Sequence, residues 1–230
     1  MSIDPFESNS ANIVAIEGGY SAPYLYLLNS DSETSTRRTQ PTAYTQRKLS
    51  AVSHAIRAGY GQGRGDAFKP WIRIRRNFSS PTSHQVFDSV GLHTRNHHFL
   101  SALEFHTALL VSYVGASELR ECLALWPYEH PHPNSGLDDD VDARLDAVPG
   151  LIEIARKAGI DHGCFVGTTV PYIASIDLMF RIRLGRTWRL LGISCKPKDI
   201  TEKSTRAQER IELDRLYCQS VVSVQQSHLA

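Results

Sequence analysis

The chain has 230 residues and a formal net charge of +1, with 41% hydrophobic and 21% charged residues, as in an ordinary globular protein. It has no apolar run as long as the roughly 18 residues of a membrane span, and its N-terminus lacks a basic region followed by an apolar core. Its four cysteines are scattered and include no C-x-x-C pair, which argues against a disulfide framework. We therefore expect a cytoplasmic protein with no membrane association.

The first third of the chain is predicted to contain an arm, a helix and a basic strand. Residues 1–40 are rich in Ser, Thr, Asn and Asp without a sustained period, which predicts a mobile arm before a domain over 41–220. A helix is predicted over 46–58, ending at the glycine-rich turn 59–65, which lacks the Gly-Lys-Ser/Thr ending of a nucleotide-binding P-loop. Residues 70–76 alternate isoleucine with arginine and predict a strand with one buried and one basic face.

Basic residues are concentrated in the stretch 37–100, which holds eleven Lys or Arg residues and only two acids. The compensating acids gather at 137–142. Such a segment is expected of a protein that binds the phosphate backbone of DNA, although a solvated charged face on any globular protein would read the same way. The candidate DNA-binding residues are Arg57, Arg64, Lys69, Arg73, Arg75 and Arg76.

The remaining two thirds of the chain are predicted to alternate helices with strands, which is typical of an α/β domain. The expected order is a helix over 101–114, a strand over 119–126, an acidic loop over 131–146, a helix over 151–158, a hairpin over 172–196 and a polar helix over 201–219. The tail over 221–230 has room for at most one short strand, 221–224, and we expect no separate C-terminal helical domain.

The hairpin over 172–196 carries a lone acid and a lone lysine on strands that are otherwise apolar. Side chains alternate along a strand, so Gly192, Ser194 and Lys196 share one face. Folding the chain about residues 183–186 brings Asp177 roughly opposite Gly192. The PD-(D/E)xK nuclease core has an acid on one strand and, further along the chain, a polar residue, one spacer and a lysine. Asp177 and Ser194-Cys195-Lys196 have this spacing.

Glu104 has two interpretations. Ser101-x-x-Glu104 is a capping box, in which the glutamate satisfies a free backbone amide at the start of a helix. Alternatively, Glu104 is a metal ligand across from Asp177, because phosphodiester cleavage needs carboxylates to hold Mg²⁺ and a cation such as Lys196 near the developing charge. Asp177 could equally form an ordinary salt bridge, and Lys196 could be a solvated lysine before a proline.

Several motifs follow one another in a fixed order over about residues 55–219. They are the glycine-rich stretch 56–65, Lys69-Pro-Trp-Ile72, Ser80-Pro-Thr-Ser-His84, Leu100-Ser-Ala-Leu-Glu104, the strand Ser117-Glu-Leu-Arg-Glu-Cys-Leu-Ala-Leu125, Ser194-Cys-Lys-Pro197 and Glu209-Arg-Ile-Glu-Leu-Asp-Arg-Leu-Tyr217. In order and spacing the chain resembles the TnsA family, the endonuclease subunits of heteromeric cut-and-paste transposases.

This resemblance implies an α/β, restriction-endonuclease-like fold of the PD-(D/E)xK type, with a mixed sheet flanked by helices. It implies that Glu104, Asp177 and Lys196 are catalytic, and that Glu104 and Asp177 are metal ligands. Ser194 and the backbone carbonyl of Cys195 would also face the metal. The cofactor would be Mg²⁺, for which Mn²⁺ could substitute.

The implied activity is metal-dependent hydrolysis of DNA at the 5′ ends of a transposon, in the bacterial cytoplasm. The implied partners are transposon-end DNA, a DDE transposase subunit (TnsB) that cuts the 3′ ends and performs strand transfer, and an AAA+ ATPase regulator (TnsC).

The chain departs from the family pattern at three points. Ser194 stands where the family has glutamine before x-Lys, and Cys122 replaces a glutamine in the strand motif. In length, the chain also resembles either a short form of the subunit, such as those in CRISPR-associated transposons, or a truncated chain. Two other functions are compatible with these residues: a non-catalytic DNA-binding or scaffolding subunit of the transposition complex, and a stand-alone restriction or repair nuclease of the same fold.

Overall fold

The computed structural model describes residues 42–75, 79, 81, 83–87, 93–136 and 145–226. The predicted arm over 1–40, the acidic stretch 137–142 and Arg76 lie outside the described residues. Among the helices that are described, none is long and apolar enough to cross a membrane.

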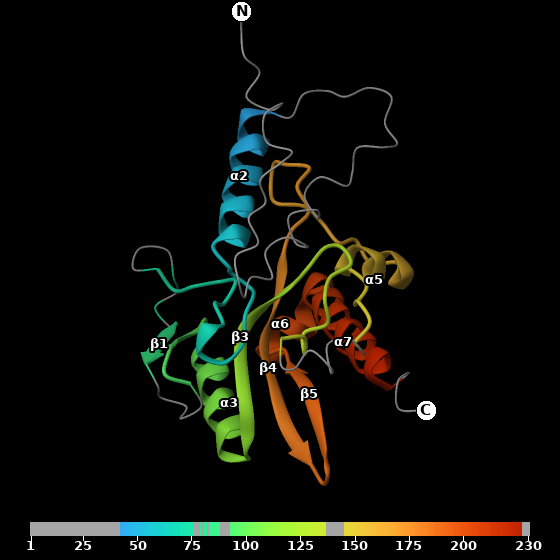
Figure 1. The fold of residues 1–230 in the computed structure, drawn as a ribbon. Helices are drawn as coiled ribbons and strands as arrows, with labels where there is room; N and C mark the ends of the chain where they lie inside the picture. Colours follow the sequence, from blue (N-terminus) through green and yellow to red (C-terminus); the bar gives the residue numbers. More distant parts are fainter. Residues whose placement is uncertain are drawn as a thin grey trace, which may run out of the picture.

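The centre of the fold is a three-stranded antiparallel sheet in the order β3-β4-β5, flanked by helices (Figure 1). The strands are β3 (Ala116–Leu125), β4 (Ala174–Leu184) and β5 (Thr187–Ile193). A second, two-stranded antiparallel sheet pairs β1 (His84–Phe87) with β2 (Asn96–Phe99), a pair that the sequence did not predict. The α/β class is therefore confirmed, whereas the described sheets are antiparallel and not mixed.

The predicted hairpin is confirmed as β4 and β5, but its register differs from the prediction. Gly185 and Arg186 form the turn, so Met179 pairs with Gly192 and Leu178 pairs with Ile193. Continuing this register places Asp177 beside Ser194, two residues from the predicted partner. The difference arises because the turn lies one residue later than assumed, and each such shift moves the cross-strand partner by two.

Helices cover the two faces of the three-stranded sheet with separate apolar clusters. On one face, α3 (Ala102–Tyr113) packs Ala108 and Val111 with Leu178 of β4. On the other face, α5 (Leu151–Ala158) and α7 (Thr205–Gln226) pack with Ile176 and Leu190 of the same sheet. Removing the apolar surface of these side chains from water is the main source of stability for such layers.

The helix predictions hold with one exception at the C-terminal end. Helix α2 (Ala43–Arg57) begins at the N-cap Thr42, α3 matches its prediction closely, and α5 matches to the residue. The polar helix is divided into α6 (Lys198–Lys203) and α7, and α7 continues to Gln226, so the predicted strand over 221–224 is wrong. Val221 is buried against the core, and this packing overrides the strand preference of valine.

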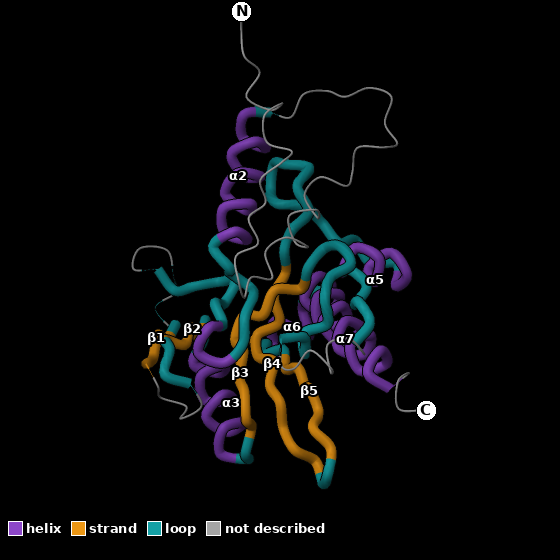
Figure 2. Tube along the Cα trace, in the orientation of Figure 1, coloured by secondary structure: helices purple, strands orange, loops and turns teal. Residues whose placement is uncertain are grey.

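The predicted basic strand over 70–76 is also wrong for the part that the structure describes. Residues 70–75 form an irregular segment, drawn as loop in Figure 2, that follows the short 3₁₀ helix η2 (Gly65–Ala67). The Trp71 N–H donates to the Cys122 carbonyl (3.0 Å), and the Ile74 N–H donates to Nδ1 of His98 (3.2 Å). The segment alternates isoleucine with arginine but is not paired as a strand. Its two backbone donors instead bond the Cys122 carbonyl and the His98 side chain.

Strand β3 changes the face that its side chains present at Cys122. The backbone of Cys122 is left-handed, with φ of 47°, which is uncommon for a residue other than glycine. Leu119, before it, packs in the cluster under α3, whereas Leu123 and Leu125, after it, pack in the cluster under α5 and α7. In a regular strand these three odd-numbered positions would share one face.

Candidate active site

Glu104 lies in the first turn of α3 and is almost fully buried. Its Oε2 accepts a hydrogen bond from the Leu100 N–H (2.8 Å), its Oε1 accepts from the Ser101 hydroxyl (3.1 Å), and Ser101 Oγ accepts from the Glu104 N–H (3.2 Å). Ser101 therefore caps the helix as predicted, whereas the backbone amide that Glu104 satisfies is that of Leu100, one residue before the predicted one. Burial raises the pKa of the Glu104 carboxyl, and the nearby charge of Asp177 raises it further. The cap thus holds this carboxylate close to a second acid.

Asp177 is buried in β4, and Oδ2 is its bonded oxygen. This oxygen accepts hydrogen bonds from Nζ of Lys196 (2.6 Å) and from the Cys195 N–H (2.7 Å). Lys196 also lowers the pKa of Glu104, so its charge reaches both acids. The structure therefore brings together Glu104 from α3, Asp177 from β4 and Lys196 from the segment after β5.

Ser194 and Cys195 point in different directions. The Cys195 side chain packs in the cluster under α3, and burial raises the pKa of its thiol. The Ser194 hydroxyl donates to Oδ2 of Asp214 on α7 (2.5 Å). Ser194, one of the two residues predicted to face the metal, is therefore bonded to Asp214, a residue that the prediction did not include.

Asp214 is the residue of this region that the prediction missed. Burial raises its pKa to about 6, against the lowering effects of Arg210 and the Ser194 hydroxyl, and the charge of Asp177 raises it further. Its Oδ1 forms an ion pair with Nη2 of Arg210 (2.5 Å), and Arg210 also donates to the Ser175 carbonyl (3.1 Å). Helix α7 therefore contacts Ser175 of β4 through Arg210, and Ser194, which directly follows β5, through Asp214. The four-residue spacing of Arg210 and Asp214 was visible in the sequence, but nothing in it showed which way they face.

The candidate metal-binding atoms near Asp177 are oxygens. Carboxylate and carbonyl oxygens are the ligands that Mg²⁺ and Mn²⁺ prefer. Glu104 and Asp177 are both buried, and the charges of Asp177 and Lys196 both act on the pKa of Glu104, the first raising it and the second lowering it. Within the described residues, no group of three or more His, Cys, Asp or Glu side chains is arranged to hold a metal ion.

Comparison with known proteins gives one match that bears on the family of the chain. No family model matches the chain. The chain is 28% identical over 170 residues to the Transposon Tn7 transposition protein TnsA of Escherichia coli. The chain is TnsA-like. The match covers 73% of this chain and 52% of the relative, so the chain spans about half the length of the curated relative it matches. The family resemblance seen in the motifs is confirmed, and the assignment to a short CRISPR-associated form stays a prediction.

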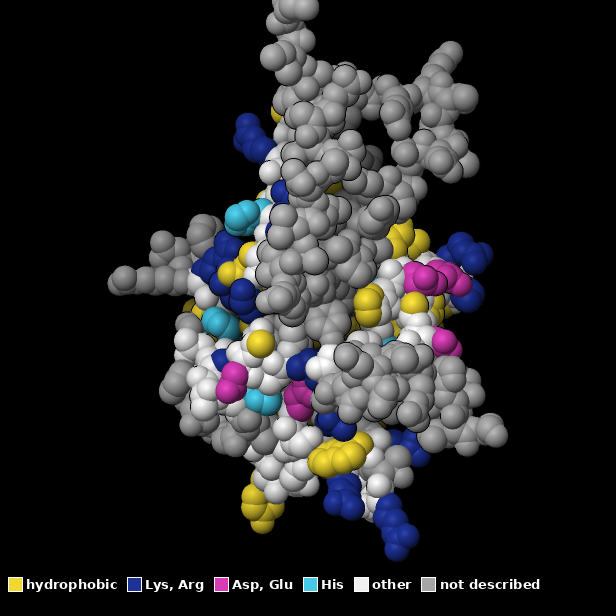
Figure 3. Space-filling model, in the orientation of Figure 1, with side chains coloured by type: hydrophobic (Ala, Val, Ile, Leu, Met, Phe, Trp, Pro, Cys, Tyr) yellow, Lys and Arg dark blue, Asp and Glu magenta, His cyan; other side chains and the backbone are white. Residues whose placement is uncertain are grey.

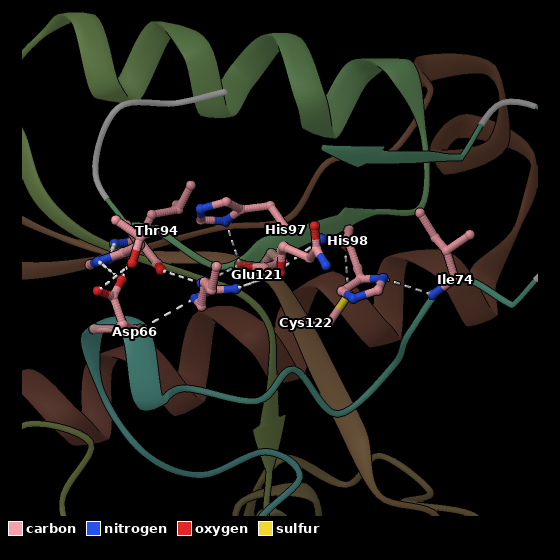
Figure 4. A network of polar contacts seen from close by, with 12 residues as sticks. Asp66, Ile74, Thr94, His97, His98, Glu121 and Cys122 are labelled. Atoms are coloured by element: carbon pink, nitrogen blue, oxygen red, sulfur yellow. Dashed lines mark hydrogen bonds and ion pairs between the residues drawn. The ribbon is translucent and has the colours of Figure 1, made fainter. Parts of the chain in front are cut away.

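The TnsA-like strand motif around Glu121 has a structural role next to the site (Figure 4). Glu121 is fully buried, and both of its oxygens accept from the Arg95 guanidinium, at 2.6 and 2.7 Å. It also contacts Nδ1 of His97 (3.2 Å) and accepts from the His98 N–H (3.2 Å). Burial opposes ionisation, but the bonds to Arg95 and His97 outweigh it and lower the pKa of Glu121 to about 2. This network fastens β2 to β3 beside Cys122.

Of the six predicted DNA-binding residues, the five that the structure describes do not form one surface. Arg64 is largely buried, paired with Glu118 and donating to the Pro133 carbonyl, so the structure places it inside the protein. Lys69 donates to the Ala58 carbonyl (2.8 Å), and Arg73 lies over the Tyr60 ring (3.8 Å to its centroid). Arg57 and Arg75 are exposed, and Arg76 lies outside the described residues.

Proposed function

We propose that the chain is a metal-dependent DNA endonuclease subunit of a transposase, which cleaves the 5′ ends of a transposon during cut-and-paste transposition. A DDE transposase of the TnsB type would cut the 3′ ends, and an AAA+ ATPase of the TnsC type would regulate the complex. The observation that carries this proposal is the meeting of Glu104, Asp177 and Lys196 from three separate elements in a TnsA-like chain. The PD-(D/E)xK assignment is part of the same proposal.

The residues of the site have separate roles in this proposal. Glu104, Asp177 and the Cys195 carbonyl would hold Mg²⁺, or Mn²⁺ in its place. The bound cation would polarise the phosphate and lower the pKa of the attacking water. Asp177 holds Nζ of Lys196 in place through a 2.6 Å hydrogen bond, so that the ammonium can face the developing negative charge. The capping box keeps the Glu104 carboxylate oriented before substrate arrives.

A strand-specific nicking assay tests the proposal. The chain is combined with its transposase, its regulator and a DNA carrying a transposon end, and each cut strand is mapped. Asp177→Asn, Glu104→Gln and Lys196→Met should each lower 5′ nicking by about 100-fold or more, since each removes a group that stabilises charge at the reacting phosphate. Glu153→Gln and Lys198→Met make the same chemical changes at exposed positions and should cut like wild type. Nicking by Asp177→Asn at the wild-type rate would overturn the assignment.

One observation favours the alternative of a non-catalytic scaffolding subunit. The Ser194 hydroxyl is committed to Asp214, and both Glu104 oxygens are used by the helix cap. Titration of Mn²⁺ into the isolated protein, followed by calorimetry, distinguishes the two functions. The nuclease proposal requires one site that Glu104→Gln weakens, whereas a scaffold would bind no ion at this position. A stand-alone nuclease would cut without the transposase.

A further inference from the structure

A groove between α2 and the irregular segment 70–75 is lined by positive charge. It has a volume of about 1070 Å³, and Arg47, Lys48, His54, Trp71, Arg73 and Arg75 contribute to its walls. We call it the α2 groove. Among the described residues that line it, none is Asp or Glu. Figure 3 shows Lys and Arg side chains gathered along α2 and at its lower end.

The cations of the α2 groove contact aromatic rings. Nζ of Lys48 lies 4.2 Å from the centroid of the Phe165 ring, and the Arg73 guanidinium lies 3.8 Å from that of Tyr60. Neither cation forms an ion pair with an acid in the described part of the chain. A cation held by a ring keeps its full charge, and its attraction for an anion is not cancelled as it would be by a carboxylate.

Other basic residues of the region are neutralised. Arg64 and Arg120 pair with Glu118, and Arg95 pairs with Glu121, all in buried positions. Among the described basic residues of the stretch 37–100, four line the α2 groove and form no ion pair with a described acid: Arg47, Lys48, Arg73 and Arg75.

The wall of the groove formed by residues 71–75 contacts strand β3 beside the candidate active site. The Trp71 N–H donates to the Cys122 carbonyl (3.0 Å), and Cys122 lies between Glu121 and Leu123, whose partners in β4 are Leu178 and Ile176. Cys122 is therefore at the level of Asp177 in the sheet. A ligand that follows the wall formed by residues 71–75 would be led towards the proposed catalytic acids.

We propose that the α2 groove binds one phosphate backbone of duplex DNA next to the point of cleavage. This inference rests on the proposed function and adds to it the surface that positions the substrate. A row of uncompensated cations is what a polyanion with regularly spaced charges requires, and such phosphate contacts fix the register of a protein on DNA. Arg47 and Lys48 join Arg73 and Arg75 in this surface, while Arg64 is excluded from it.

Salt-dependent binding to duplex DNA tests the groove without requiring cleavage. Fluorescence anisotropy of a labelled 30-base-pair duplex is measured with the full chain in EDTA, over a range of NaCl concentrations. The triple variant Lys48→Gln, Arg73→Gln, Arg75→Gln should bind more weakly, and its plot of log affinity against log salt should be shallower by about 2 to 3, since each lost phosphate contact removes about 0.9 from the slope.

The matched control makes the same charge change on another surface. Arg156→Gln, Lys157→Gln and Lys198→Gln remove three exposed cations from α5 and α6 and should leave the slope within about 0.5 of wild type. Equal slopes for the groove variant and wild type would overturn the inference. Tighter binding of duplex RNA than of duplex DNA would overturn it as well.

The outcome for the groove can be told apart from the outcome for the proposed function. Asp177→Asn should bind the duplex with the wild-type salt slope although it does not nick. The groove variant should raise the DNA concentration needed for half-maximal nicking, and it should still cut the same strand. If the groove variant has an unchanged salt slope and nicks like wild type, the groove proposal is rejected and the nuclease proposal stands. If the wild-type protein binds DNA but shows no metal-dependent nicking, the nuclease proposal is rejected.

Discussion

Protonation of His130 should destabilise the protein between pH 6.5 and pH 4. His130 is buried, with Nδ1 2.9 Å from the Tyr128 carbonyl and Nε2 2.9 Å from the Tyr217 hydroxyl. A carbonyl only accepts, so Nδ1 carries the proton and Nε2 accepts from Tyr217. A second proton on the ring would compete with that bond in a buried place. Burial accordingly lowers the pKa of His130 from 6.5 to about 4.

The size of the effect follows from this difference in pKa. Below pH 6.5 the unfolded chain binds a proton at His130 that the folded protein does not, so the free energy of unfolding falls as the pH falls. A difference of about 2.5 pH units, at 1.36 kcal/mol each, corresponds to a loss of about 3 kcal/mol by pH 4. Above pH 6.5 both states are neutral at this residue and the contribution is constant.

Urea unfolding at a series of pH values measures this loss, and a His130→Asn variant isolates it. The variant has a side-chain amide in place of Nδ1–H and has no group that titrates. Burial also lowers the pKa values of His93, His98, His132 and His162, so wild type and variant will both lose stability in acid. The wild type should lose about 3 kcal/mol more between pH 7.5 and pH 4. Parallel curves for the two proteins would refute the reasoning.

Three further changes have effects that follow from contacts already described. Asp214→Asn should raise the Mn²⁺ concentration for half-maximal nicking several-fold, because Ser194 and Arg210 lose their charged partner; an unchanged metal titration would contradict this. Gly192→Ala should lower the free energy of unfolding by about 1–3 kcal/mol, since an added Cβ would lie 2.5 Å from Cδ1 of Ile176 and 2.6 Å from Sγ of Cys218. Glu121→Gln should cost about 3–5 kcal/mol in urea unfolding by leaving the buried Arg95 charge unpaired, and a cost below about 1 kcal/mol would show that the network is not stabilising.

The elements that local signals define could be predicted from the sequence. Helix α5 has buried Leu151, Ile154 and Ala155 at helical spacing and ends at Gly159 in the left-handed conformation, so its bounds were predicted to the residue. The β4–β5 hairpin follows from its β-branched and aromatic composition and a turn containing Gly185. Glu104 was recognised both as a cap and as a candidate ligand, and the structure shows that the cap does not exclude its position beside Asp177.

The remaining differences come from contacts between residues far apart in the chain. Residues 70–75 alternate like a strand, but their backbone bonds to Cys122 and His98. Arg64 was predicted from the basic stretch alone, and its ion pair with Glu118 could not be seen there because the two residues are 54 positions apart. Asp214 was not recognised because only the packing of α7 on β5 turns it towards Ser194. Pairings of this kind are set by tertiary structure and leave no local pattern.

The left-handed backbone at Cys122 has a consequence for how the two helical layers communicate. A regular sheet separates what lies above it from what lies below, and a change on one side is shielded from the other. At the level of Cys122 and Asp177 this separation fails, since the charge of Asp177 acts both on Glu104 in the α3 layer and on Asp214 in the α7 layer. A movement of α3 or of α7 would therefore change the electrostatic interactions of the same carboxylate, that of Asp177.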